Sequence, residues 1–193
     1  MPVKELLSIV AVVLTLAAFL PYIRSILKHE SKPHVFSWVI WGSTTFIVFL
    51  AQREGGGGVG AWPIGISGVI TLLIALLAWS RKSDISISRL DWLFFTLALW
   101  ALPLWYATAD PLWAVAILTL IDVLGFGPTV RKIYHFPWSE SLVFFGLFAA
   151  RNLIVILALE NYSLTTVLFP AVIGAACVLL IALALHRRRV MAA

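Results

Sequence analysis

The stretch PYIRSI at residues 21–26 reappears as PTVRKI at residues 128–133, an offset of 107 residues. Further correspondences follow in the same order at offsets of 104 or 107: Ser37 with Ser141, Trp41 with Phe145, Gly42 with Gly146, Trp62-Pro63 with Phe169-Pro170, and Arg81-Lys82 with Arg188-Arg189. A fixed internal period indicates that one structural unit is built more than once and packs against its copy. The second half of the chain therefore repeats the first.

The composition is that of a chain surrounded by lipid. Hydrophobic residues make up 62% of the sequence, charged residues 12%, and the mean hydropathy is +1.01. A soluble domain carries about 25% charged residues. The pI of about 9.7 does not indicate nucleic acid, because the basic residues lie between apolar segments instead of clustering on one domain.

Seven apolar segments approach or exceed the roughly 20 residues that a membrane-crossing helix needs. They run over Leu6–Ile23, His34–Gln52, Ala61–Ser80, Trp92–Thr108, Leu112–Val130, Ser141–Leu159 and Leu164–His186. Each repeat holds three of them, and Trp92–Thr108 is unmatched. The sequence predicts an all-α membrane protein with two parallel three-helix repeats, residues 1–82 and 111–193, joined by a linker helix within 83–110.

Lysine and arginine predict the orientation, because they are retained on the cytoplasmic side. Only Lys4 and Arg53 fall on one side of the predicted spans, and Arg151 lies inside a span. The other side holds the rest of the basic residues: Arg24, Lys28, Lys32, Arg81, Lys82, Arg89, Arg131, Lys132, Arg187, Arg188 and Arg189. We expect the N-terminus outside and the C-terminus in the cytoplasm.

The duplicated unit, with a proline near the inner end of its first helix and a basic loop after it, resembles the PQ-loop and SWEET (MtN3) superfamily of transporters. The resemblance is carried by PYIRSILKHESKPHVFSWVIWG at 21–42 and GFGPTVRKIYHFPWSES at 125–141, which are similar to bacterial members. Tyr22 and Thr129 stand where the family motif has glutamine. The resemblance implies a multi-pass protein of the bacterial inner membrane that moves a small solute.

Two charges are predicted to lie inside the membrane, Asp122 in the fifth span and Arg151 in the sixth. Their counterparts in the first repeat are Thr15 and Ile47, so the charges are not a requirement of the repeated unit. Intramembrane charges cost about 2.5–3.5 kcal/mol on insertion scales and usually face a partner or a cavity. They are either a structural salt bridge or a substrate and proton site. Some PQ-loop transporters are similar in carrying a proton-binding aspartate near the second proline motif.

Further candidates for the solute site are Ser37, Trp41, Ser67 and Asn152, which lie on helical faces that could line one central pocket. The alternative is that small and hydroxylated residues simply pack the helices closely. Pro21 and Pro128 each remove a backbone donor near an inner helix end and are candidate hinges. The glycines at 55–58 predict a flexible hairpin on the outer side.

No catalytic residue, metal site or cofactor is predicted. Gly65-Ile66-Ser67-Gly68 matches a serine-protease motif, but that chemistry needs a histidine within reach of the serine. The four histidines all fall in cytoplasmic loops or at a cytoplasmic helix end, and they lack zinc-site spacing. The single cysteine, Cys177, lies deep in the last span, where it cannot form an intramolecular disulfide.

The predicted function is transport of a small polar solute, such as a sugar, an amino acid or a vitamin-like compound. Two three-helix bundles would rock around a site near the membrane midplane, with protons as a candidate coupling ion. The expected partners are the lipid bilayer, the solute and protons, with no nucleic acid, and the arrangement is compatible with a homo-oligomer. The alternative is a receptor or sensor that binds a solute on the same fold without moving it.

The orientation predicts a labelling pattern in a variant whose Cys177 is replaced by serine. A cysteine introduced at Gly56 should react with a membrane-impermeant thiol reagent added from outside, and a cysteine at Lys32 should not. The reverse pattern would show that the orientation is wrong.

Overall fold

A computed structural model describes residues 3–29, 33–81, 87, 89–138 and 140–192. Regular structure within these residues is helical throughout, which confirms the prediction of an all-α chain. The helices are α1 (Val3–Leu27), α2 (Val35–Glu54), the 3₁₀ turn η1 (Gly58–Ala61), α3 (Trp62–Ser80), α4 (Arg89–Thr108), α5 (Pro111–Gly125), α6 (Gly127–His135), α7 (Leu142–Ala158) and α8 (Leu164–Ala192).

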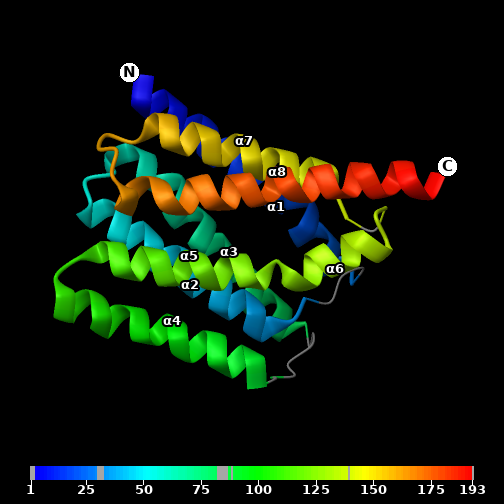
Figure 1. Cartoon of the computed structure of the whole chain (residues 1–193), viewed down its shortest axis with the longest axis horizontal. Coiled ribbons are helices and arrows are strands. Elements are labelled where there is room, and N and C mark those ends of the chain that lie inside the picture. The colour runs from blue at the N-terminus through cyan, green and yellow to red at the C-terminus, as the bar shows by residue number, and fades with distance from the viewer. Residues whose placement is uncertain (1–2, 30–32, 82–86, 88, 139, 193) are drawn as a thin grey trace.

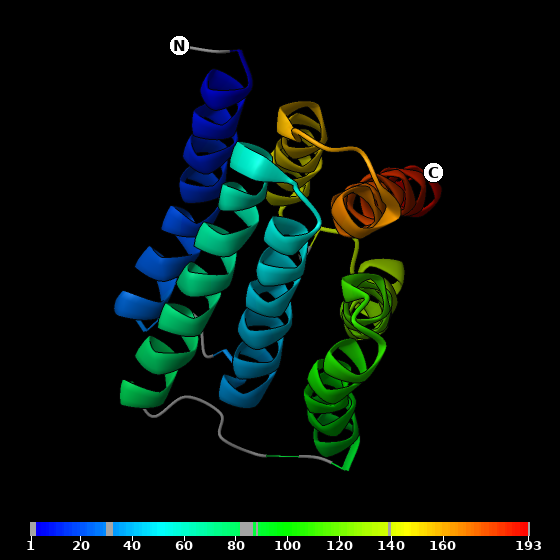
Figure 2. The same ribbon diagram turned by 90° about the vertical axis from the view of Figure 1, so that its left-hand side faces the viewer.

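The helices run side by side along one axis, and the two chain ends lie at opposite ends of the bundle (Figure 1). Helix α3 lies between α1 and α2, as Figure 2 shows. Helix α8 takes the same place in the second half, in contact with both α5 and α7. The halves meet where α1 packs on α7 and α2 packs on α5, while α4 lies at the edge against α5 and α2.

Five helical stretches are long and apolar enough to cross a membrane: Val3–Leu27, Val35–Glu54, Gly58–Ser80, Pro111–His135 and Leu164–Met191. The other two predicted spans correspond to α7 (Leu142–Ala158), an apolar helix of 17 residues, and to the apolar stretch Trp92–Thr108 within the 20 residues of α4. At 1.5 Å per residue a helix of 17 residues is about 26 Å long, slightly short of a hydrocarbon core of about 30 Å. The sequence therefore predicted the apolar helices, and among the described residues five stretches are both long and apolar enough to cross a membrane.

The fifth predicted span, Leu112–Val130, is divided in the structure. Helix α5 ends at Gly125, Phe126 caps it, and α6 begins at Gly127 with Pro128 in its first turn. Proline has no N–H to donate to the carbonyl four residues earlier, and glycines on both sides of Phe126 weaken the helix further. By contrast, α1 continues through Pro21 to Leu27, where no glycine flanks the proline.

Large apolar side chains cover the outside of the bundle. Exposed examples on separate helices are Leu76 at 58%, Trp100 at 65%, Leu153 at 59% and Leu179 at 69% of full exposure. Soluble monomers rarely expose contiguous apolar surface of this extent, because water does not solvate it well. The buried face of the bundle instead holds hydroxyl, amide and charged side chains, including Thr15, Gln52 and the residues of the site described below.

The end of the bundle formed by the connections 55–61 and 159–163, here called the loop end, is closed. The backbone N–H of Val59 donates to Glu160 Oε1 at 3.1 Å, and Asn161 Nδ2 donates to the Gly55 carbonyl at 2.9 Å. A Cβ on Gly60 would lie 2.6 Å from the backbone nitrogen of Leu159. The structure packs this connection against the second half, where the sequence predicted a flexible hairpin. Here glycine permits backbones of the two halves to touch, and gives Gly58 a φ of +59°.

The close approach at Gly60 predicts a position-specific loss of stability. Gly60→Ala should cost about 1–3 kcal/mol, because its methyl group meets backbone that cannot rotate away. Gly146→Ala, in the middle of α7, is the matched control, since no atom lies within 4 Å of its Cβ position. Thermal unfolding in detergent should show a lower Tm for Gly60→Ala and an unchanged or slightly higher Tm for Gly146→Ala. Equal effects would contradict the backbone contact.

Candidate functional site

A cavity of about 860 Å³ lies between the two halves of the bundle. It reaches from the middle of the helices to the end where α1, α3 and α8 finish, here called the basic end after Arg24, Arg81 and Arg187. The described residues of the loop end do not line it. The cavity is therefore open toward one end of the bundle and closed toward the other.

Equivalent positions of the two sequence repeats line this cavity in pairs. The pairs are Phe19 with Phe126, Tyr22 with Thr129, Ser25 with Lys132, Ser37 with Ser141, and Trp41 with Phe145. Helices α1 and α2 carry the first member of each pair, and the second lies on or beside α5, α6 and α7. Because both repeats contribute equivalent positions to its wall, the cavity lies where the two repeats face each other.

Asp122, on α5, is one of two buried charged residues in the cavity wall and is 8% exposed. Its Oδ1 accepts a hydrogen bond from the Thr44 hydroxyl of α2 at 2.8 Å. Thr44 lies one turn after Trp41 on α2 and is fully buried. Its counterpart by offset in the second repeat is Phe148, so this contact has no equivalent on the other side of the cavity.

Arg151, on α7, is the other buried charged residue and is 2% exposed. Its Nη2 donates to the Ser67 hydroxyl of α3, and its Nη1 donates to Asn152 Oδ1, each at 3.1 Å. The guanidinium carbon lies 4.9 Å from the centre of the Phe148 ring, within the range of a cation–π contact. Its Nε is buried and has no hydrogen-bond partner within the described part of the chain.

The two buried charges do not bind each other. Among the described residues the only ion pair joins Lys132 and Glu140, and Arg151 contacts only neutral oxygens and a ring. The alternative of a structural Asp122–Arg151 salt bridge is therefore wrong for this conformation. The sequence predicted both charges inside the membrane but could not show that each would bond to a different neighbour.

Five of the six predicted solute residues line the cavity together: Ser37, Trp41, Ser67, Asp122 and Arg151. The sixth, Asn152, is fully buried behind the wall, where its amide fixes Arg151 and donates to the Phe148 carbonyl at 2.9 Å. The candidate hinge Pro21 also lines the cavity. Pro128 does not remove a hydrogen bond from a continuous helix, since it lies in the first turn of α6.

An aromatic wall beside the charges was not predicted. The Phe144 and Phe148 rings lie 4.6 Å apart, and Phe19 meets Phe148 edge to face at 5.3 Å. Tyr22 and Trp38 stack at 5.0 Å with an interplanar angle of 19°. Phe148 lies three residues before Arg151, a spacing that puts the two side chains next to each other on a helix. The contact between this ring and the cation could therefore have been predicted from the sequence.

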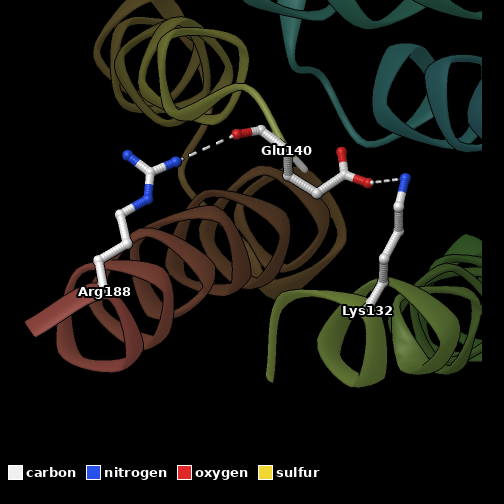
Figure 3. A network of polar contacts seen from close by, with 3 residues as sticks. All are labelled: Lys132, Glu140 and Arg188. Atoms are coloured by element: carbon white, nitrogen blue, oxygen red, sulfur yellow. Dashed lines mark hydrogen bonds and ion pairs between the residues drawn. The ribbon is translucent and has the colours of Figure 1, made fainter. Parts of the chain in front are cut away.

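A polar network joins three segments at the basic end (Figure 3). Glu140 Oε1 pairs with Lys132 of α6 at 2.7 Å, while the Glu140 carbonyl accepts from Arg188 of α8 at 3.5 Å. Arg188 Nε also donates to the Pro137 carbonyl at 2.9 Å. Lys132 and Glu140 line the cavity mouth, so their charges neutralise each other there.

In comparisons with known proteins, no family model matches the chain, and neither a curated protein nor a solved structure does. The described residues contain no group of three or more histidine, cysteine or acidic side chains that could hold a metal ion. What the cavity offers is one buried cation, one buried carboxyl group, hydroxyls and aromatic rings. Groups of these kinds are the ones that orient small polar molecules in protein pockets.

The partners of Arg151 predict that the residue lowers stability. A buried cation with only neutral partners keeps much of its desolvation cost, and replacing buried ionic groups by apolar ones of similar volume is often neutral or stabilising by 1–4 kcal/mol. Arg151→Met should therefore raise the Tm in detergent. Arg24→Met is the control at an exposed position and should change the stability by less than about 0.5 kcal/mol. A lower Tm for Arg151→Met would show that the arginine holds α7 to α3.

Proposed function

We propose that the chain is a multi-pass transporter of the bacterial inner membrane that moves a small polar solute by alternating access. The observation that carries this proposal is the cavity between the repeats, open at the basic end and closed at the loop end. A transporter must expose a central site to one side at a time. A cavity that ends near mid-bundle, at Asp122 and Arg151, has the form of one such state.

The proposed membrane fold consists of α1–α3 and α5–α8 as two parallel repeats, with α4 as the linker. Support comes from the helix order, since the third helix of each half packs between the other two. The exposed apolar side chains and the five spanning-length helices favour insertion in lipid. Helix α4 contacts α5 and α2 at the edge of the bundle, as a connecting helix would.

The proposed orientation puts the basic end in the cytoplasm, following the distribution of lysine and arginine. The cavity then faces inward, and the contacts at the loop end form the closed outer gate. Membership in the PQ-loop and SWEET superfamily is part of the proposal, and it is supported by the two proline motifs and by the paired positions that line the cavity.

The proposed hinge lies at the junction of α5 and α6, where Gly125, Phe126 and Gly127 interrupt the helix. Motion there would carry Thr129 and Lys132 toward or away from the cavity mouth. Pro21 is the corresponding position in the first repeat, and its missing donor leaves α1 weaker at that turn.

The hinge predicts an effect of Pro128→Ala on rate. The alanine N–H can bond to the Leu124 carbonyl and join α5 to α6, so solute flux should fall while the protein stays folded. Pro103→Ala is the control, because it changes a proline inside α4, at the edge of the bundle. Unchanged flux for both variants would show that Pro128 ends a helix and has no role as a hinge.

The proposed proton carrier is Asp122, which is the buried acid of the cavity and lacks a cationic partner. Asp122→Asn should abolish uptake driven by a pH gradient and retain exchange of solute across the membrane. If the transport step moves net charge, each inward proton adds about 2.3 kcal/mol of driving force per 100 mV of membrane potential. Because Arg151 is not paired with Asp122, the variant should keep its thermal stability.

The control for that measurement is Asp110→Asn on the same helix. Asp110 caps α5 through Leu112 N at 2.9 Å, and asparagine caps equally well, so uptake should be unaffected. Full gradient-driven uptake by Asp122→Asn protein would rule out the proton role.

The experiment that tests transport itself is uptake of labelled sugars, amino acids and organic acids into proteoliposomes. Binding detected by thermal stabilisation, together with flux, supports a transporter. Binding with no flux of the bound solute in either direction would instead support a receptor on the same fold.

A further inference from the structure

The incompletely bonded guanidinium of Arg151 indicates the chemistry of the solute. Two of its five N–H groups bond to Ser67 and Asn152, and the Nε–H has no partner. A buried cation is stable only when a negative group compensates its lost hydration. No described acidic side chain lies within ion-pair distance of Arg151. A bound anion would supply that negative group, and a carboxylate matches the planar fork of a guanidinium.

The charge balance of the cavity limits that anion to a single charge. Several helices and connections contribute titratable or charged residues to the cavity lining. These residues are Tyr22, His34, Asp122, Lys132, Glu140, Arg151 and Cys177. Lys132 and Glu140 are paired with each other, which leaves Arg151 as the one cation free to compensate an anion deep in the described cavity. A dianion such as sulfate would keep an uncompensated charge in an apolar bundle.

The same balance couples the anion to a proton. With the cavity empty, the charges of Arg151 and ionised Asp122 sum to zero. A bound carboxylate makes the sum negative, and a proton on Asp122 restores it to zero. Moving net charge through an apolar membrane is costly, so a loaded cavity with zero net charge is the form that can change conformation most readily.

The wall beside Arg151 indicates the rest of the solute. Phe148 lies under the guanidinium, Phe144 packs on Phe148, and Phe19 meets both rings edge to face at 5.3 and 6.4 Å. Rings of this kind pack against apolar groups and offer few hydrogen bonds. A sugar, with a hydroxyl on most carbons, would leave those hydroxyls unpaired against this wall.

We propose that the solute is a small monocarboxylate with an apolar body, held by Arg151 and moved together with one proton that Asp122 carries. This inference rests on the proposed transport function and names its substrate class. The step is a proton transfer only. The Asp122 carboxylate takes a proton from water on the more acidic side and returns it to water on the other, and no covalent bond to the solute forms or breaks.

Binding is tested with matched pairs of probes that differ only in charge. Benzoate and hexanoate should raise the Tm of the full-length protein, and benzamide and hexanamide should not. Inorganic phosphate and sulfate, which test for a general oxyanion site, should also fail. Arg151→Gln should bind benzoate about thirtyfold more weakly or worse, because truncating one partner of a buried charge pair costs at least about 2 kcal/mol. Arg151→Lys should recover part of that loss.

Folding of these variants is checked by their own unfolding transitions without a probe. Equal stabilisation of wild type and Arg151→Gln by benzoate, or stabilisation by phosphate or sulfate and not by carboxylates, would overturn the carboxylate site. Asp122→Asn mimics the protonated acid. It should bind benzoate at neutral pH at least as tightly as wild type, with a weaker dependence on pH.

Transport is tested in proteoliposomes under imposed gradients. Uptake of labelled benzoate in excess of that by protein-free liposomes, which measures the passive entry of benzoic acid, should follow an inward pH gradient. It should remain unchanged when a potassium–valinomycin potential of either sign is applied, because no net charge moves. Potential-driven benzoate uptake would overturn the one-to-one proton coupling. Flux of a neutral sugar that persists in Arg151→Gln would overturn the carboxylate inference and leave the transporter intact. Benzoate binding without flux would retain the site and overturn transport.

Discussion

Polar groups inside this apolar bundle must find partners among themselves, and that requirement organises the rest of the structure. Thr15, Thr71 and Thr119 meet it locally, since each hydroxyl donates to the carbonyl one turn earlier. Asp122 and Arg151 cannot do so and take partners from other helices, Thr44 of α2 and Ser67 of α3. Each charge therefore joins two helices at the cavity wall. The cavity is the place where a molecule from outside can complete the set of partners.

Equivalent positions of the two sequence repeats face the same cavity, but their side chains differ in chemistry. Both halves put a serine and an aromatic ring, Ser37 with Trp41 and Ser141 with Phe145, on the cavity wall. The charges break that symmetry, because Thr15 and Ile47 occupy the corresponding places in the first repeat. Symmetric walls suit a motion in which one half tilts against the other. Asymmetric charges suit a solute that has one polar end and one apolar end.

The sequence predicted the helices because each apolar segment is bounded by charged, glycine or proline residues. It predicted five cavity residues because helical spacing puts them on common faces. It did not predict the division at Phe126, which depends on two glycines and a proline acting together. It also predicted a flexible glycine loop where Gly60 packs on Leu159. Contacts of that kind join residues about a hundred positions apart, and no local pattern contains them.

The contacts at the loop end also affect how the chain is made. Val59 bonds with Glu160, Gly55 with Asn161, and Lys4 with the carbonyl of Leu159, so each contact needs a residue that follows α7. During synthesis the first three helices are complete long before that residue leaves the ribosome. The groups of the glycine connection that bond to residues 159–161 then lack these partners until the second half arrives. Closure of the loop end is therefore a late event of biogenesis, and a chain truncated before residue 159 lacks the groups that close it.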